Sequence, residues 1–369
     1  MTQLVLAGGG HAHLLVLEHL AKHRHDGLEV VLLTPSPWQY YSGMLPGWVA
    51  GRYAMDDCRI DLRPLADAAG AKLMLEPVAA MNADKSQVGF ADGCQLAYDL
   101  LSLDVGSETN SAWLAGFGRR LLTVKPLDAF QTAWADLMDS DRAEYDARIV
   151  VVGGGAAGVE LALAMRSALN RAARRTAITL VEGQSGLLSG HNRGVRKRAA
   201  RALDRASIDV RPGRAKGVEA GVRLATGETL EADAMVAATG ARAPDWLGSS
   251  GLALDGRGFV AVDPYQRSLS HANVFAAGDV SSRADNNLPK SGVHAVRAGP
   301  VLAHNLLATW QNGALTPYRP KAASLYLMVS GNGRAIASWG RWSAEGSWIW
   351  RWKDLIDRRF VRRFAIRAA

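Results

Sequence analysis

The chain alternates short apolar runs with longer segments in which apolar residues recur at helical spacing. An apolar run at residues 4–6 precedes Gly8-Gly9-Gly10, a helical segment at 11–22 and a second apolar run at 29–33. The same order recurs with apolar residues 149–152, Gly153-Gly154-Gly155, a helical segment at 156–170 and apolar residues 177–181. A strand, a glycine turn, a helix and a second strand form the βαβ unit of a dinucleotide-binding fold. The repeat therefore predicts two such units in one chain.

Two further apolar runs, at 234–239 and 274–277, are each followed by a glycine and fit the same parallel sheets. We therefore predict an α/β fold with two Rossmann-like dinucleotide-binding domains, of which the first is split by the second. The expected boundaries are 1–117 and 245–325 for the split domain, 118–244 for the inserted domain and 326–369 for a C-terminal region. Residues 121–128 and 239–245 are the expected crossovers.

The glycines of each turn have separate tasks. In a GxGxxG turn the first glycine permits the tight turn, the second admits the pyrophosphate and the third lets helix and strand pack closely. Gly153, Gly155 and Gly158 fill all three positions, whereas Gly8 and Gly10 fill two and His13 replaces the third. We expect His13 to widen the packing without abolishing phosphate binding. The helix starts that would face phosphate are His11-Ala12 and Ala156-Ala157.

An acidic residue after the second strand of such a unit binds the adenosine ribose. Glu182 holds this position in the second unit, and its carboxylate would repel a 2′-phosphate, which favours NADH over NADPH. The other interpretation of Glu182 is a solvated charge at a strand end. In the first unit the position falls at Thr34, followed by Pro35, and a hydroxyl binds ribose more weakly than a carboxylate.

The chain has 369 residues and a net charge of +8, and the basic excess is concentrated near its end. Residues 351–367 contain seven basic and two acidic side chains. Helical spacing places Trp352, Ile356, Phe360 and Phe364 on one face, flanked by arginines. This composition is typical of a helix on an anionic membrane surface, and the alternatives are packing on the protein body or a homodimer contact. A nucleic-acid partner is not expected, because no separate recognition fold accompanies the basic run.

Cys58 and Cys94 form no CxxC pair, and the nine histidines show no metal-binding spacing. We expect neither a dithiol centre nor a metal site. Two lone cysteines fit a reducing compartment, and neither a signal peptide nor an apolar run of 18 residues is recognisable. The expected location is the cytoplasm, with the basic helix allowing peripheral binding to the inner face of the cell membrane.

Several motifs resemble the pyridine nucleotide–disulfide oxidoreductase superfamily of flavoproteins. Type II NADH dehydrogenase-like proteins are the most similar branch, and within it the chain resembles the oxidoreductase domain sometimes fused to selenophosphate synthetase. The resemblance covers nearly the whole chain and implies FAD in the split domain and NAD(H) in the inserted one. The motifs that carry it are Gly8-Gly9-Gly10-His11-Ala12-His13, the segment 152–161, Phe275-Ala276-Ala277-Gly278-Asp279, and the segments 40–47, 289–297 and 350–360.

The resemblance also implies roles for individual residues. Asp279, beside Gly278, would bind the ribityl chain of FAD, and Val78 would meet the adenine. Ser291, Gly292 and Val293 would open a helix near the flavin, and a helix N-terminus there stabilises negative charge. Gly106 lies in Asp104-Val105-Gly106-Ser107, where the family usually has Thr-Gly. Gly240 directly follows the apolar run at 234–239.

Glu160, Tyr41 and Ser42 are the candidate catalytic residues. By resemblance Glu160 faces the flavin–nicotinamide junction, where a carboxylate orients nicotinamide or relays a proton, and the alternative is a buried charge paired across the domain interface. Tyr41 and Ser42 would lie beside the isoalloxazine, where a tyrosine serves either packing or chemistry. The expected cysteine pair of the disulfide reductases is missing.

The function predicted from these observations is FAD-dependent NADH:acceptor oxidoreduction, with a quinone as the acceptor. A flavoprotein dehydrogenase serving selenium or sulfur metabolism is a second hypothesis, based only on the fused relatives. A third hypothesis is a non-enzymatic flavin-binding redox sensor or interaction module, against which the intact second glycine turn and Glu182 argue.

Overall fold

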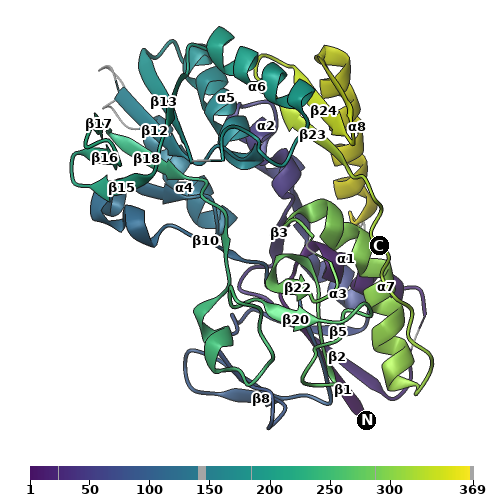
Figure 1. Ribbon diagram of the computed structural model, residues 1–369. Coiled ribbons are helices and arrows are strands. Elements are labelled where there is room, and N and C mark those ends of the chain that lie inside the picture. Colours follow the sequence, from purple (N-terminus) through teal and green to yellow (C-terminus); the bar gives the residue numbers. More distant parts are fainter. Residues whose placement is uncertain (24, 140–146, 184, 287, 366–369) are drawn as a thin grey trace.

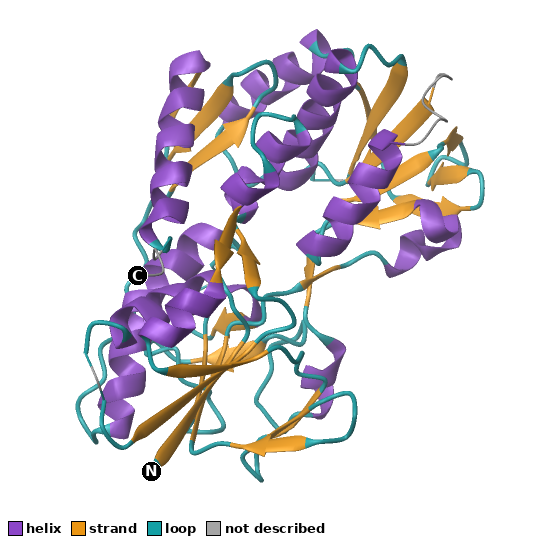
Figure 2. Ribbon diagram, turned by 180° about the vertical axis from the view of Figure 1, so that it is seen from behind, coloured by secondary structure: helices purple, strands orange, loops and turns teal. Residues whose placement is uncertain are grey.

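The computed structural model describes residues 1–23, 25–139, 147–183, 185–286 and 288–365. Two lobes, each built on a five-stranded parallel sheet, lie one above the other, and a long C-terminal helix lies beside the upper lobe and reaches the lower lobe with its end (Figure 1). Viewed from behind, helices cover one side of each sheet and smaller antiparallel strands lie on the other (Figure 2).

The first sheet has the strand order β21-β9-β1-β2-β5, in which every neighbouring pair is parallel. Its buried residues alternate between two cores, so that Leu4 and Leu6 pack on one face and Val5 and Ala7 on the other. The helices α1, α3 and α7 cover the first face. The bounds are β1 Thr2–Ala7, β2 Leu28–Leu33, β5 Ala71–Met74, β9 Leu100–Leu103, β21 Val274–Ala276, α1 His11–Leu20, α3 Leu62–Ala68 and α7 Gly292–Trp310.

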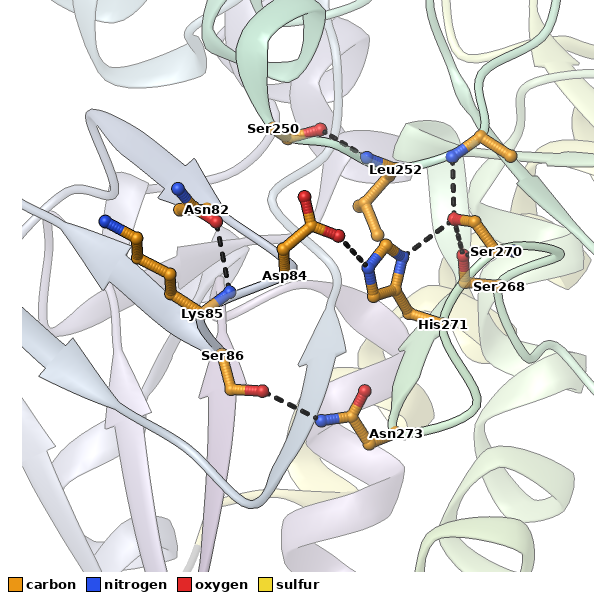
Figure 3. Close-up of polar contacts among 11 residues, drawn as sticks. Asn82, Asp84, Lys85, Ser86, Ser250, Leu252, Ser268, Ser270, His271 and Asn273 are labelled. Atoms are coloured by element: carbon orange, nitrogen blue, oxygen red, sulfur yellow. Dashed lines mark hydrogen bonds and ion pairs between the residues drawn. The ribbon is translucent and has the colours of Figure 1, made fainter.

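Segments far apart in sequence close the other face of this sheet. A three-stranded antiparallel sheet of β6 (Ala80–Asn82), β7 (Gln87–Gly89) and β8 (Gln95–Ala97) packs there with residues 243–262. The Asp84 carboxylate lies 3.2 Å from Nε2 of His271, and the Asn273 amide donates to the Ser86 hydroxyl at 3.3 Å (Figure 3). These contacts join the N-terminal part of the lobe to the part that follows the inserted lobe.

The second sheet has the order β11-β18-β12-β13-β14 and is also parallel. The apolar helix α5 is buried against one face, and the sheet β15-β16-β17 covers the other. The bounds are β11 Leu121–Thr123, β12 Ala147–Val152, β13 Thr176–Glu182, β14 Asp209–Pro212, β18 Ala234–Ala237, α4 Leu127–Asp139, α5 Ala156–Arg171, α6 Arg193–Arg205, β15 Ala215–Val218, β16 Gly221–Leu224 and β17 Thr229–Glu231.

The two connections between the lobes pair with each other. β10 (Glu108–Thr109) and β19 (Ala241–Arg242) form a short antiparallel ladder, and the Arg242 guanidinium contacts the Glu108 carboxylate. The remaining short elements are β3 Trp38–Tyr40, β4 Arg59–Asp61, β20 Val260–Val262, β22 Ser281–Arg283, α2 Leu45–Val49, and the 3₁₀ turns η1 Ser42–Met44, η2 Met55–Cys58, η3 Ala112–Arg120, η5 Asp245–Ser249 and η6 Gly278–Val280.

The C-terminal region consists of a three-stranded antiparallel sheet and one helix. The sheet contains β23 (Leu325–Val329), β24 (Ala335–Trp339) and β25 (Trp342–Gly346), and α8 spans Ser347–Arg363. Near its start, α8 buries Ile349 against the sheet, and Phe364 just beyond its end enters the core of the first lobe. Among the described residues, no helix is long and apolar enough to cross a membrane.

The apolar stripe predicted for α8 is divided between the protein body and solvent. Phe364 is buried and Phe360 is half-buried, but Trp352 and Ile356 are exposed to solvent. The buried line of the helix instead includes Lys353 and Asp357. These two side chains satisfy each other inside the protein, which leaves part of the apolar stripe facing outward.

Candidate functional site

A cavity of about 400 Å³ opens at the carboxyl ends of the first parallel sheet. This edge of an open α/β sheet is where ligands bind. Most of the residues predicted to bind FAD line the cavity, whereas Ala12, Ser291 and Val293 are not in its wall. The predicted residues in the wall are Gly8, Gly9, Gly10, His11, Thr34, Pro35, Ser42, Val78, Gly106, Gly278, Asp279 and Gly292.

The first glycine turn is held by close contacts that exclude larger side chains. Gly8 has φ +98°, and a Cβ there would lie 2.4 Å from the Asp104 carbonyl oxygen. His13 stands in place of the third glycine, and its imidazole fills the space between the turn and β9. Its Nδ1 lies 2.6 Å from the Gly8 carbonyl oxygen and its Nε2 lies 2.8 Å from the Ser102 hydroxyl.

Asp104 is a site residue to which the sequence analysis assigned no role. Its carboxyl group is buried and accepts the backbone N–H groups of Ala12 at 2.7 Å and His13 at 3.0 Å. Burial raises the pKa of this carboxyl to about 8, against the lowering effect of the two hydrogen bonds. The signal available in the sequence was an acid that directly follows the run Leu100-Leu101-Ser102-Leu103 and lies two positions before Gly106.

Asp279 lies at the predicted flavin end of the cavity, on η6. The Lys125 ammonium approaches its carboxylate at 2.5 Å, and the Ser107 hydroxyl donates to it at 3.3 Å. Lys125 comes from the first crossover and also donates to the Ser107 hydroxyl at 2.9 Å. Lys125 could not be predicted from the sequence, because only the fold brings together residues 154 positions apart. Asp279 can accept ribityl hydroxyl groups while Lys125 balances its charge, so these residues fit FAD.

Ser291 and Gly292 begin α7 beside the cavity, as predicted from the family motif. Gly292 lies in the wall, with the Ser42 hydroxyl 3.8 Å from where a Cβ would stand. Val293 continues the first turn of the helix. The free N–H groups of this turn can stabilise negative charge on a bound flavin.

The second glycine turn meets the stricter form of the motif. A Cβ on Gly153 would lie 2.1 Å from the Ala238 carbonyl oxygen, and one on Gly158 would lie 1.8 Å from that of Gly153. Nothing lies within 4 Å of a Cβ on Gly155, which precedes Ala156 and Ala157 at the start of α5. The space for a phosphate is therefore open at a helix N-terminus.

Glu182 ends β13 next to this turn. Its Oε2 atom is buried and has no hydrogen-bond partner among the described residues. An unpaired buried carboxylate oxygen at this position fits the ribose diol of NAD(H), which would supply the missing donors. Gly240 lies beyond β18 at φ +99° and marks the start of the second crossover.

Glu160 is held between the second lobe and the C-terminal sheet. It accepts the backbone N–H of Val329 on β23 at 2.7 Å. Burial raises its pKa to about 7, although the Lys353 ammonium nearby acts in the opposite direction. Glu160 thus sits at an interface of the two elements, with a protonation equilibrium close to neutral pH.

Lys353 and Asp357 link α8 to the segment that lines the flavin cavity. The Lys353 ammonium donates at 2.6 Å both to the Gly43 carbonyl oxygen and to the Asp357 carboxylate. Each side chain is only 6% exposed. Gly43 follows Ser42 of the cavity wall, so the position of α8 is coupled to the flavin site.

Tyr41 packs behind the cavity wall rather than in it. Its ring lies 4.6 Å from that of Phe360 on α8 and 5.5 Å from that of His11, measured between ring centres. Burial, together with the nearby Asp357, raises the pKa of its phenol well above the usual value. Tyr41 is neutral at physiological pH and connects α8 to the first helix start.

Neither cysteine is part of a bridge. Cys58 is buried, Cys94 is exposed, and both are free. Burial raises the pKa of the Cys58 thiol to about 12, which leaves it unreactive. Within the described part of the chain, no three His, Cys, Asp or Glu side chains are grouped as metal ligands.

Two parallel sheets, each with a glycine turn that opens onto a helix start, define a flavoprotein oxidoreductase with two dinucleotide sites. A family model described as pyridine nucleotide-disulphide oxidoreductase matches residues 2–299, and the chain belongs to this family. Its cofactor is FAD, and NAD(H) is the co-substrate. The protein is an NADH-dependent flavin oxidoreductase.

Curated relatives agree with this class. An NADH dehydrogenase-like protein of Mycobacterium tuberculosis is 29% identical over 294 residues, which cover 76% of this chain and 73% of the relative. The epsilon subunit of an NADH-dependent phenylglyoxylate dehydrogenase of Aromatoleum evansii is 28% identical over 297 residues, 76% of this chain and 66% of that protein.

Solved structures share the fold at low identity. The sulfide:quinone oxidoreductase of Aquifex aeolicus superimposes with a TM-score of 0.81 at 17% identity, covering 100% of this chain and 93% of the other. NDH2 of Plasmodium falciparum in complex with NADH gives a TM-score of 0.80 at 14% identity, with 98% of both chains covered.

Proposed function

We propose that the protein is an NADH:quinone oxidoreductase that works on an anionic membrane surface. The observation that supports this most directly is the double role of α8. One side of the helix presents tryptophan and arginine to solvent, and the other side contacts the segment beside the flavin cavity.

The outward side of α8 has the composition of an interfacial helix. Trp348, Trp352, Leu355 and Ile356 are 54%, 37%, 66% and 39% exposed. Large apolar side chains are rarely left in water in such a group, whereas the headgroup region of a bilayer accepts them. The arginines exposed on the same helix would contact anionic lipid headgroups; they are Arg351, Arg359 and Arg362.

The inward side of α8 lies next to the flavin cavity, which favours an acceptor that arrives from the membrane. Lys353 holds Gly43, the neighbour of Ser42 in the flavin cavity wall, and Phe360 stacks on Tyr41. A quinone that leaves the bilayer along α8 would therefore arrive next to the flavin. The names of NADH dehydrogenase-like relatives support NADH as the electron donor.

Each lobe would bind one of the two dinucleotides. The second glycine turn and Glu182 would bind NADH, and the first turn, Asp279 and Lys125 would bind FAD. Bound FAD supplies the redox chemistry, since it accepts a hydride from NADH and passes two electrons onward. Glu160, whose pKa lies near 7, could hold or release the proton that quinone reduction consumes.

Two measurements test the proposal in sequence. Anaerobic mixing with NADH should bleach the flavin absorbance in a stopped-flow instrument, whereas a sensor module would show no bleaching with NADH or NADPH. Steady-state turnover with a soluble quinone should then exceed turnover with O₂. Equal rates, or no rate with quinone after full bleaching by NADH, would leave the oxidoreductase intact and reject quinone as its acceptor.

A further inference from the structure

The two glycine turns have the same backbone arrangement, and they differ in one buried side chain that packs against the turn. Asp104 follows β9 as Ala238 follows β18, and their backbone N–H groups donate to Ala7 and Val152 respectively, both at 2.8 Å. Each residue also places its carbonyl oxygen against the first glycine of its turn. The FAD turn therefore carries an acid where the NAD turn carries a methyl group.

The acid occupies the helix terminus to which a pyrophosphate would be drawn. Its Oδ2 accepts the N–H groups of Ala12 and His13 in the first turn of α1. A Cβ on either Gly10 or Gly278 would lie 2.3 Å from an atom of the Asp104 carboxyl group. Asp104 is only 4% exposed, so it sits within the floor of the phosphate site rather than at its rim.

The charged groups around Asp104 do not neutralise it. From η6, the negative charge of Asp279 disfavours ionisation of Asp104, and the Lys125 ammonium is committed to the Asp279 carboxylate. From α1, burial lowers the pKa of both His11 and His13 to about 4, so both are neutral at physiological pH. The His13 ring is moreover bonded to Gly8 and Ser102. Among the described residues, no salt bridge reaches Asp104.

A bound pyrophosphate would bring further negative charge to this terminus. Two like charges within a few ångströms favour the neutral form of the group that can take up a proton. Both hydrogen bonds reach Oδ2, which leaves Oδ1 to carry that proton.

We propose that Asp104 binds a proton when FAD binds, so that cofactor affinity in the first lobe is coupled to pH. This inference rests on FAD binding and not on the identity of the electron acceptor. Since burial already raises the pKa of Asp104 to about 8, the free protein carries the proton below that pH and must acquire it above. The FAD dissociation constant should then be flat below about pH 7. Above about pH 8 it should rise by up to about tenfold per pH unit.

The test is a titration of the full-length apoprotein with FAD by isothermal calorimetry. Measurements at pH 7 to 9.5, in two buffers of different ionisation enthalpy, give both the affinity and the protons taken up. We expect uptake of nearly one proton per FAD above pH 8.5 for the natural protein. Asp104→Asn, which keeps the shape, and Asp104→Ala, which copies Ala238 of the other turn, should show no uptake and a flat pH profile.

A control acid in the same lobe checks that the effect is local. Asp84→Asn changes a carboxylate that is 83% exposed and should keep the natural pH slope. Absence of proton uptake by the natural protein, or an unchanged slope in Asp104→Asn, would overturn the inference.

A second readout does not require the apoprotein. Infrared spectra of the FAD-bound natural protein and of FAD-bound Asp104→Asn are recorded at pH 8 and compared. The natural protein should show the carbonyl band of a protonated carboxyl group that the variant lacks. An equal band in both proteins would also reject the proposal. Because neither experiment uses NADH or quinone, failure of the proposed function would leave both outcomes readable.

Discussion

At the scale of single residues, burial decides which acids of this protein can change charge near neutral pH. Asp104 and Glu160 both have raised pKa values because the surrounding protein replaces the water that would stabilise their charged forms. Asp61 and Asp233, each hydrogen-bonded to an arginine nearer the surface, have lowered pKa values instead. The two raised acids lie in the FAD turn and at the interface of α5 with β23.

Glu160→Gln should change how stability depends on pH. The natural carboxyl has a pKa of about 7 when folded, against 4.5 as its ordinary value. Between these values the folded protein binds the proton and the unfolded chain does not, so Glu160 makes stability fall as pH rises. The variant lacks this loss, and its Gln oxygen can still accept the Val329 N–H. Relative to the natural protein, the free energy of unfolding of the variant should therefore increase by about 1–3 kcal/mol between pH 5 and pH 7. Its melting temperature, compared with that of the natural protein at each pH, should rise accordingly.

Glu219→Gln, at an exposed position, is the control for this measurement. It should follow the natural protein at every pH. Parallel melting curves for the natural protein and Glu160→Gln across this range would mean that Glu160 is ionised in the folded state throughout.

The site residues that the sequence revealed are those with a local signature. Gly153, Gly158 and Glu182 are set by the spacing within one βαβ unit, which fixes the turn, the helix start and the end of the next strand. Lys125 and Lys353 could not be found in this way, since their partners Asp279 and Gly43 lie 154 and 310 residues away. Helical spacing alone cannot tell which partner a helix face will meet.

At the scale of elements, α8 joins parts of the chain that have little else in common. Its first turns pack on the C-terminal sheet, its middle bonds to Gly43, and its end reaches α1 through Arg363 and Glu18. The spacing of the apolar residues predicted the helix, but not which of its sides would face the protein. A buried Lys353–Asp357 pair is an expensive interior contact that hydrophobic periodicity would not select.

Lys353→Met should loosen α8. The change leaves Asp357 without its ion-pair partner and the Gly43 carbonyl without its donor, and removal of one member of a buried pair costs about 3–5 kcal/mol. The cost should fall toward the lower figure, because burial already raises the pKa of Asp357 and lets it become neutral. Hydrogen exchange of residues 347–363 should accelerate, and the melting temperature should drop.

Two further variants show whether the loss of stability comes from breaking the Lys353–Asp357 ion pair. Lys353→Met combined with Asp357→Leu should recover part of the stability, since no unpaired charge remains. Arg358→Met, which breaks partly exposed pairs with Asp354 on the same helix and with Asp57 on η2, should cost about 2 kcal/mol or less. A double variant no better than Lys353→Met would show that the contact to Gly43, and not the ion pair, holds the helix.

At the scale of the whole molecule, the fold follows from two repeated patterns. Alternating strands and helices predict parallel sheets wherever they occur, so both sheets could be read from the chain. The position of one sheet relative to the other could not be predicted, because it depends on contacts such as the β10–β19 ladder and on the end of α8 reaching the first lobe (Figure 1). The same arrangement places the exposed Trp348 and Trp352 in the first turns of α8, the part of the helix that packs on the C-terminal sheet.

The exposed side of α8 should bind anionic vesicles. We expect the natural protein to co-sediment with vesicles containing phosphatidylserine more than with neutral ones, and less as salt rises, because arginines flank the apolar residues. Replacing Trp348, Trp352 and Leu355 together by Ser should weaken this binding at least about tenfold, since it removes the apolar area that enters the headgroup layer. Trp113→Ser removes a tryptophan that is 41% exposed on η3, away from α8, and should have no effect. If the natural protein stays in the supernatant but forms a dimer that the triple variant breaks, this side of α8 is a contact between two copies of the chain and the membrane interpretation fails.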